Sequence, residues 1–404
     1  MHSSLQEEAG RLLSANAMQD RGYYFVAPSK RKYSHQFSWD SAFHAIANCG
    51  LGRVDPARRE IMTLLSCMLP DGTLPHLIFH DPSRASPIIR LFRRSIWPQP
   101  YRSPLVQPPI VALAVREIWR RSEDAGFLRE ALPLLQRHFE WLETRRLGDS
   151  GLLSTFSPWE SGQDHKPGFD RYLGRLRRVP LGFHMGLYLS EIRLSCHGYD
   201  PAEVVKRGYF NVREVLFNTA YVLGLEALTE MSLAVGETAA AERFRKRGER
   251  VEKAILDECH DAGTGLYFDV DAHTGQRIAE PSISCLMPLA LGGIPEPRRD
   301  GLLRHLKNSG EFWLPFPVPS LPKSSRYFRP EAQRLLWRGP TWINTNWLLL
   351  LGLRRHGYSE IADAVARSSR ELVERAGFWE YYNPLTGEGE GERDFSSSTL
   401  AAIM

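Results

Sequence analysis

Apolar residues recur every three or four positions through most of this chain, which is the spacing expected of helices with one buried face. The stretch Val-Ala-Leu-Ala-Val-Arg-Glu-Ile-Trp at 111–119 is a clear example. The pattern predicts about twelve helices, over residues 5–16, 39–50, 56–68, 108–121, 125–145, 181–195, 211–233, 236–258, 282–290, 297–307, 341–355 and 358–376, with a last one over 394–404.

Strand signals are few in comparison. The clearest is Gly-Leu-Tyr-Phe-Asp-Val at 265–270, followed by turn residues at 272–275, where we expect a short β-hairpin. Helices joined by Pro- and Gly-rich loops predict an all-α fold, an (α/α)6 toroid barrel of six helical hairpins with this β-hairpin inserted. A repeat solenoid is the structural alternative, but the chain shows no fixed repeat period. Because no linker interrupts the pattern, we expect residues 1–404 to form one domain.

Composition narrows the class of protein further. The 404 residues suffice for one large helical barrel, and a net charge of +4 spread over short clusters argues against a nucleic-acid partner. The N-terminus is polar and acidic, and no apolar run is long enough to span a membrane. The five cysteines are widely spaced and lack a CxxC pair, which predicts neither disulfides nor a zinc site. We therefore expect a cytoplasmic protein without metal or organic cofactor.

Two acidic segments carry the strongest chemical signal. Glu-Ser-Gly-Gln-Asp occupies 160–164, and Glu-Tyr-Tyr-Asn-Pro-Leu-Thr-Gly occupies 380–387. Both fall on expected loops and have aromatic neighbours that can stack on a sugar. Cleavage of a glycosidic bond needs one protonated carboxyl group and one ionised carboxylate, so the pair suits that reaction. The residues alone also allow that either acid caps a helix or pairs with an arginine.

Several short motifs resemble those of known enzymes. Trp159–Asp164 resembles the "ESG-x-D" segment of trehalases and of glycoside hydrolase family 63, which contains mannosylglycerate and glucosylglycerate hydrolases. The other matches follow in family order from about residue 33 to the C-terminus. They are similar to "WDS-x-F" at 37–44, "P-(D/N)-G-x-x-PH" at 70–76, "QPP" at 107–109, "RGP-x-W-x-x-x-N" at 337–346 and "EYY(N/D)P-x-TG" at 380–387.

The resemblance implies a function and a catalytic pair. Asp164 corresponds to the general acid and Glu380 to the general base of an inverting, exo-acting α-glycosidase. The implied substrate is a small α-glucoside or α-mannoside, such as mannosylglycerate or glucosylglycerate. Glu160 and Glu388 are the competing candidates for the two catalytic roles.

Sugar sites combine flat aromatic faces with planar polar groups, and the motif segments supply both. For each tryptophan the alternative is a place in the hydrophobic core, and for Asp40 it is a helix cap. The residues expected to bind the substrate are Trp39, Asp40, His76, Gln107, Trp159, Gly162, Arg338, Trp342, Asn346 and Tyr381.

Basic residues near the motifs bear on the aglycone. An arginine at the rim of the barrel would bind an anionic aglycone such as glycerate, although solvent-exposed charge is the alternative for each one. Segment 80–104 also carries aromatic residues and is expected to form a lid loop. The clusters are Lys30–Lys32, then Arg84, Arg90, Arg93, Arg94 and Arg102, and finally Arg171, Arg175, Arg177 and Arg178.

Two departures from the family pattern leave the substrate open. His165-Lys166 stands where relatives often have Asn-Ser, and 395–399 reads Phe-Ser-Ser-Ser-Thr where relatives tend to have "FSWT". Two other functions also remain. A sugar epimerase on the same six-hairpin barrel would need two histidines at the rim, and a non-catalytic sugar-binding protein would need neither acid. The expected partner is a small carbohydrate, and the oligomeric state stays open.

Overall fold

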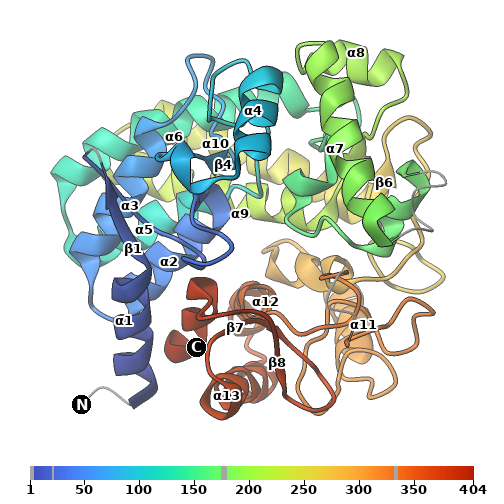
Figure 1. The fold of residues 1–404 in the computed structure, drawn as a ribbon. Coiled ribbons are helices and arrows are strands. Elements are labelled where there is room, and N and C mark those ends of the chain that lie inside the picture. Colours follow the sequence, from blue (N-terminus) through green and yellow to red (C-terminus); the bar gives the residue numbers. More distant parts are fainter. Residues whose placement is uncertain (1–3, 21, 174–179, 332–334) are drawn as a thin grey trace.

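Helices dominate the computed structural model, which describes residues 4–20, 22–173, 180–331 and 335–404 (Figure 1). The α-helices are α1 (Ser4–Asn16), α2 (Ser38–Gly50), α3 (Val54–Ser66), α4 (Pro87–Ile96), α5 (Val111–Ser122), α6 (Ala125–Arg146), α7 (Pro180–Cys196), α8 (Pro201–Lys206), α9 (Val215–Ala234), α10 (Thr238–Ala254), α11 (Glu296–Leu306), α12 (Ile343–Arg355) and α13 (Ser359–Ala376). Shorter helices are the 3-10 segments η1 (Pro82–Arg84), η2 (Pro158–Ser161), η3 (Pro167–Tyr172), η6 (Ile283–Ala290) and η7 (Ser396–Ile403), and the π turn η5 (Ile255–Cys259).

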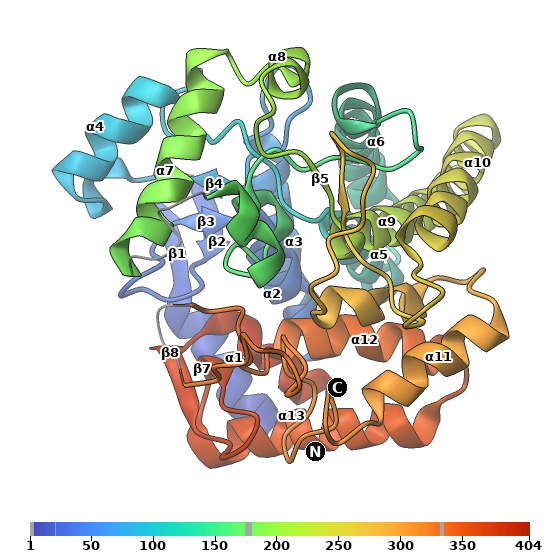
Figure 2. The same ribbon diagram turned by 90° about the vertical axis from the view of Figure 1, so that its right-hand side faces the viewer.

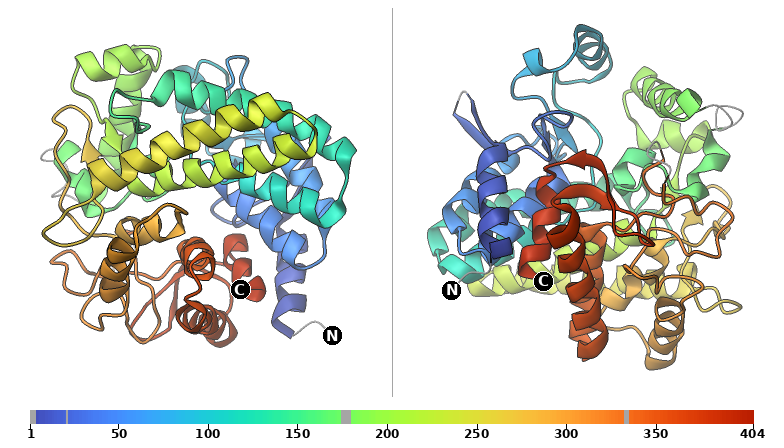
Figure 3. Two further views of the ribbon diagram at one scale, coloured as in Figure 1. Left: turned by 180° about the vertical axis from the view of Figure 1, so that it is seen from behind. Right: turned by 60° about the horizontal axis from the view of Figure 1, so that its bottom comes forward.

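An inner ring of helices closes on itself. In order around the ring, α2 packs on α5, α5 on α9, α9 on η6, η6 on α12, α12 on η7, and η7 back on α2. Each inner element packs against an outer helix next to it in the chain, and α1 at the N-terminus covers η7 at the C-terminus. Figure 3 shows α9 and α10 running side by side, and the first helix, α1, lying beside the last, η7. The expected (α/α)6 barrel is confirmed.

The amino-acid pattern explains which helices are inside. Nearly every residue of α2 and most of α9 are buried, as expected for inner helices. Most of α9 is apolar, whereas α2 also buries polar residues such as Asp40, His44 and Asn48. In contrast, α10 buries one stripe and exposes a face of Arg, Lys and Glu residues. Two inner elements, η6 and η7, are 3-10 helices where the sequence predicted ordinary helices. Pro288 within η6 cannot donate the backbone hydrogen bond that an α-helix requires.

Short strands line the mouth of the barrel. The described strands form antiparallel pairs: β1 (Ala17–Asp20) with β2 (Tyr23–Val26), β3 (Gln36–Phe37) with β4 (Leu77–Ile78), β5 (Val212–Arg213) with β6 (Val270–Asp271), and β7 (Trp379–Tyr382) with β8 (Gly389–Arg393). The hairpin expected around 265–275 is present, and β6 within it also pairs with the distant β5. Across its own turn, Val270 forms a bridge with Arg277, and the N–H groups of Asp271 and Ile278 donate to the carbonyls of Gln276 and Asp269. The hairpin formed by β7 and β8 was not predicted.

Segment 80–104 contains a helix that the sequence pattern missed. Ser86 accepts a hydrogen bond from the backbone of Ile89, and Pro87 occupies the first turn, so α4 begins with an ordinary capping signal. Figure 2 shows α4 beside α7, and the two helices are in contact. Both stand above the ring, next to the pocket described below.

No helix in the described ranges is long and apolar enough to cross a membrane.

Candidate active site

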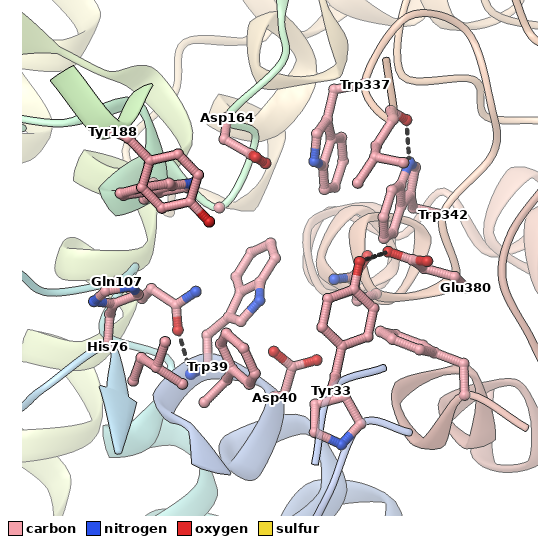
Figure 4. A pocket seen from close by; sticks show the side chains of 18 of the residues that line it. Tyr33, Trp39, Asp40, His76, Gln107, Asp164, Tyr188, Trp337, Trp342 and Glu380 are labelled. Atoms are coloured by element: carbon pink, nitrogen blue, oxygen red, sulfur yellow. Dashed lines mark hydrogen bonds between the residues drawn. The ribbon is translucent and has the colours of Figure 1, made fainter. Parts of the chain in front are cut away.

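A pocket of about 290 Å³ opens at the mouth of the barrel (Figure 4). Both predicted catalytic acids, Asp164 and Glu380, line it and approach from different sides. Its other described lining residues are Pro28, Tyr33, Phe37, Trp39, Asp40, His76, Leu77, Arg93, Gln107, Trp159, Gly162, Tyr188, Leu336, Trp337, Trp342, Asn344 and Phe395.

Glu380 lies on β7 and is almost completely buried. Its Oε1 accepts a hydrogen bond of 2.9 Å from the Tyr33 hydroxyl, and its Oε2 accepts one of 3.0 Å from the backbone N–H of Glu392. The Lys32 ammonium lies 3.8 Å from Oε2. Burial raises the pKa of Glu380, while Lys32, Tyr33 and the Glu392 N–H oppose that rise. The ionised carboxylate is therefore well supplied with partners, yet more basic than an ordinary glutamate.

Asp164 lies on the loop between α6 and α7, at a turn closed by a hydrogen bond of 3.0 Å from the Lys166 N–H to the Gln163 carbonyl. Its side chain keeps 21% of its surface exposed, and its Oδ2 lies 3.5 Å from Nε2 of His165. The charge of Asp164 also contributes to raising the pKa of Glu380. The two carboxyl groups thus share one pocket and influence each other electrostatically.

Aromatic rings form the walls between the two acids. Trp337 and Trp342 stack with centroids 4.1 Å apart and planes 5° apart, and Trp39 lies 6.5 Å from Trp337. Gly162 has a φ of +71°, and a Cβ added there would meet the Trp39 ring at 2.7 Å. A glycine is needed at this position for both its backbone conformation and its closeness to the ring. Trp337 lies within a quoted motif but was not among the predicted site residues.

Polar groups line the floor of the pocket. Oδ1 of Asp40 accepts a hydrogen bond of 2.7 Å from Ser397, whose hydroxyl also lies 3.2 Å from Nε2 of His44. Burial raises the pKa of Asp40, against the influence of His44 and Ser397. Oε1 of Gln107 accepts hydrogen bonds from the Ser38 hydroxyl and the Trp39 N–H. These hydrogen bonds fix the orientations of Asp40 and Gln107, and both side chains line the pocket.

One end of the pocket is built by the two outlying helices. Arg93 of α4 forms a buried ion pair with Glu191 of α7, and Glu191 also accepts a hydrogen bond of 2.7 Å from Trp97. The guanidinium carbon of Arg93 lies 5.2 Å from the Trp159 ring centroid and 5.5 Å from that of Tyr188. Tyr188 was not predicted, because α7 carries none of the quoted motifs.

His76 completes this end of the pocket. Burial, together with the nearby Arg93, lowers the pKa of His76 to about 3, so its imidazole is neutral. Its ring stacks beside Trp159, with centroids 6.5 Å apart, and its buried Nδ1 has no hydrogen-bond partner in the described part of the chain. A sugar or aglycone hydroxyl could supply that partner.

Three predicted substrate-binding residues do not line the described pocket. Arg338 donates to the backbone carbonyl of His165 and pairs with Asp170, so it holds the Asp164 loop instead. The Asn346 side chain bonds the backbone of 317–318 and the Ser369 hydroxyl. Tyr381 is buried behind Trp342, with ring centroids 5.1 Å apart. Asn344, on the same helix as Asn346, lines the pocket in its place.

Neither competing acid lines the pocket. Both oxygens of the fully buried Glu160 accept hydrogen bonds from Arg146, and they also bond the backbone N–H groups of Val106 and Phe156. Glu388 is solvent-exposed and contacts Thr386. The contacts of both acids lie outside the pocket.

The basic residues expected at the rim differ in position. Of those that the structure describes, Arg93 lines the pocket and Lys32 lies beside Glu380. Arg31 pairs with Glu392 on β8, and Arg84 pairs with Asp81. Arg175, Arg177 and Arg178 lie outside the described residues.

Potential metal ligands do not gather in the described ranges. No group of three or more His, Cys, Asp or Glu side chains there is placed to hold a metal ion. All five cysteines are unpaired, and Cys196 is the exposed one.

Comparison with known families identifies the class of this barrel protein as a glycoside hydrolase. Residues 33–398 match the family model described as the mannosylglycerate hydrolase MGH1-like glycoside hydrolase domain. The chain therefore belongs to this family.

Relatives of known name extend over nearly the whole chain. Mannosylglycerate hydrolase of Thermus thermophilus is 31% identical over 94% of this chain and 96% of its own length. Glucosylglycerate hydrolase of Mycolicibacterium hassiacum is 28% identical over 92% of this chain and 91% of its own length. The crystal structure of the GH63 mannosylglycerate hydrolase from Thermus thermophilus in complex with Tris and D-glycerate superposes with a TM-score of 0.88, at 30% identity and 99% coverage of both chains. Inversion of configuration is general in glycoside hydrolase family 63.

Proposed function

We propose that this chain hydrolyses a small α-glucoside or α-mannoside with inversion, with Asp164 as general acid and Glu380 as general base. The observation that carries the proposal is that these two acids line one pocket in different surroundings. In this mechanism Asp164 protonates the glycosidic oxygen as the bond to the anomeric carbon breaks. Glu380 takes a proton from water, which attacks the anomeric carbon from the opposite face.

The surroundings of Glu380 support its role as the base. Tyr33, Lys32 and the Glu392 N–H hold its carboxylate in one orientation, while burial raises its pKa. A base works best when its pKa lies near the working pH, so this combination favours deprotonation of water. Asp164 lies on the more accessible side, where it can reach the oxygen of the leaving group.

The size and walls of the pocket support an exo-acting enzyme. About 290 Å³ lies just below the range of ligand pockets, which begins at about 300 Å³, and suits one sugar ring with a small aglycone. The rings of Trp39, Trp337 and Trp342 supply apolar faces for the C–H groups of the sugar. Asp40, Gln107 and the unpartnered Nδ1 of His76 supply polar contacts for hydroxyl groups.

For the aglycone we propose glycerate, bound near Arg93. This arginine lines the pocket beside Tyr188, Trp159 and His76, and a guanidinium binds a carboxylate with matched geometry. The names of the mannosylglycerate and glucosylglycerate hydrolase relatives support the same substrate class.

We also propose that segment 80–104 acts as a lid, since α4 within it supplies Arg93. We further propose that the chain is a single catalytic domain and that it is located in the cytoplasm.

The two other functions have less support. An epimerase would need a pair of histidines in the site, whereas His76 is the histidine that lines the described pocket. A sugar-binding protein would have no use for a buried Glu380 held by three partners.

Proton NMR of the anomeric signals tests the proposal. The purified protein is incubated with mannosylglycerate, glucosylglycerate, trehalose, and free glucose and mannose. We expect the β-anomer of the sugar to appear first from an α-linked glycerate glycoside, and neither Asp164→Asn nor Glu380→Gln to release it. First appearance of the α-anomer would mean retention. Interconversion of free sugars would favour the epimerase, and binding without cleavage would favour a sugar-binding protein.

A further inference from the structure

Lys166 is a buried cation two residues after the proposed general acid. Only 3% of its side chain is exposed, and its Nζ lies 2.5 Å from Oε1 of Glu214 and 2.7 Å from Oδ2 of Asp269. The Ser284 hydroxyl lies 3.3 Å from the same nitrogen. Burial lowers the pKa of Lys166, but the two carboxylates outweigh this and the pKa is raised, so the side chain is charged.

The partners of Lys166 belong to the rigid part of the barrel. Glu214 caps α9 through its contact with the Phe217 N–H, and Oδ1 of Asp269 accepts a hydrogen bond of 3.0 Å from the Val215 N–H. Ser284 lies on the inner helix η6. An ion pair with these groups therefore ties the loop to the ends of two inner-ring elements.

Asp164 is held between two residues that are both tied to this cluster. The Lys166 N–H donates to the Gln163 carbonyl and closes the turn in which Asp164 lies. The Gln163 side chain is linked to the Ser284 hydroxyl at 2.8 Å, and Ser284 contacts Glu214 at 2.7 Å. Lys166 itself does not line the described pocket. It acts on the pocket through the direction it gives to Asp164.

We propose that Lys166 is a positioning residue for proton donation, because its ion pairs with Glu214 and Asp269 fix the turn that aims Asp164 at the leaving oxygen. The inference rests on the proposed role of Asp164. A displacement of about 1 Å in a catalytic group can cost about 100-fold in rate, so a loosened turn would impair this one proton transfer.

The test compares two substrates that differ in their need for an acid. An α-glycosyl fluoride releases fluoride with little protonation, whereas the methyl α-glycoside of the same sugar needs a proton on its oxygen. The variants are Lys166→Met and the double variant Lys166→Met/Glu214→Gln, in which the second change removes a stranded carboxylate and protects folding. Arg247→Met is the control, because Arg247 forms a partly buried ion pair with Glu143 on outer helices.

We expect the Lys166 variants to lose at least tenfold more kcat on the methyl glycoside than on the fluoride, with KM changed less than twofold. The basic limb of the pH profile for the methyl glycoside should also move. Arg247→Met should change kcat on both substrates by the same factor. Equal losses on the two substrates in the folded double variant would overturn the inference and leave Lys166 a purely structural residue.

Asp164→Asn separates this inference from the proposed function. It should show the same asymmetry between the two substrates, more strongly. If Asp164→Asn impairs both substrates equally, the acid role of Asp164 fails. If Asp164→Asn separates the substrates and the Lys166 variants do not, only the positioning role fails.

Discussion

The hydroxyl of Tyr33 donates a hydrogen bond of 2.9 Å to Oε1 of Glu380, across a sequence separation of 347 residues. This bond stabilises the ionised carboxylate and so lowers the pKa of Glu380, against the larger effect of burial. Tyr33 thereby sets how easily the proposed base gives up its own proton. The pKa of Tyr33 is raised well above its ordinary value by burial and by Glu380, so the phenol remains a donor.

Tyr33→Phe should shift the acidic limb of the pH profile to higher pH. Without the hydroxyl, the pKa of Glu380 rises further, and the base is protonated over a wider range of acidic pH. The measurement is kcat/KM against pH for wild type, Tyr33→Phe and the remote control Tyr358→Phe. An unchanged acidic limb in Tyr33→Phe would mean that Glu380 is not the group that must be ionised.

Gly162→Ala should impair both the fold of the loop and the sugar site. The added Cβ would meet the Trp39 ring at 2.7 Å, and the φ of +71° is strained for alanine. Overpacking of this kind costs about 1–3 kcal/mol, and the displaced Trp39 ring would no longer match the sugar. We expect kcat/KM to fall by about tenfold or more. Gly275→Ala is a suitable control, because it also has a positive φ but meets nothing within 4 Å. Equal activity of the two variants would contradict a role for Trp39 at the site.

The sequence predicted the barrel well because the apolar spacing of both layers follows the helical period, with the inner α9 apolar on most sides and the outer α10 on one. It missed α4, whose apolar residues Ile88 and Leu91 are exposed, so that its pattern does not reflect a buried face. The motifs picked out two acids, Asp164 and Glu380, that the structure brings to one pocket. The motifs could not show which of the neighbouring residues line this pocket.

The direction of the side chains explains why some of the predicted site residues do not line the pocket. Asn344 and Asn346 are two positions apart on α12, which turns them to different sides of the helix, and only the first lines the pocket. Arg338 lies next to Trp337 but turns toward Asp170. What distinguishes Arg93 from its basic neighbours is its buried partner Glu191, which lies 98 residues further along the chain. The residues next to Arg93 in the sequence give no sign of this pairing.

Glu160→Gln should destabilise the protein strongly. Glu160 is fully buried and satisfies both Arg146 and two backbone N–H groups, so the change strands a buried guanidinium. Breaking a buried pair in this way costs about 3–5 kcal/mol. Chemical denaturation should show the loss as a lower free energy of unfolding. Glu242→Gln is the control, because its pair with Arg245 is solvent-exposed and contributes little to stability. Similar stabilities for the two variants would contradict the anchoring role of Glu160.

Replacing Arg93 should change the choice of aglycone more than the cleavage of the sugar. Because a single substitution would strand Glu191 in the interior, the informative variant is Arg93→Met/Glu191→Gln, in which Trp97 keeps an acceptor. A hydrogen bond to a charged group contributes about 1.5–3 kcal/mol, which corresponds to about 10–100-fold in affinity. We expect KM for the glycerate glycoside to rise by that factor, while KM for the uncharged methyl glycoside of the same sugar changes little. Arg90→Met on the same helix serves as the control. Equal rises in KM for the charged and uncharged substrates would show that Arg93 shapes the pocket without recognising a carboxylate, and glycerate would lose its proposed partner.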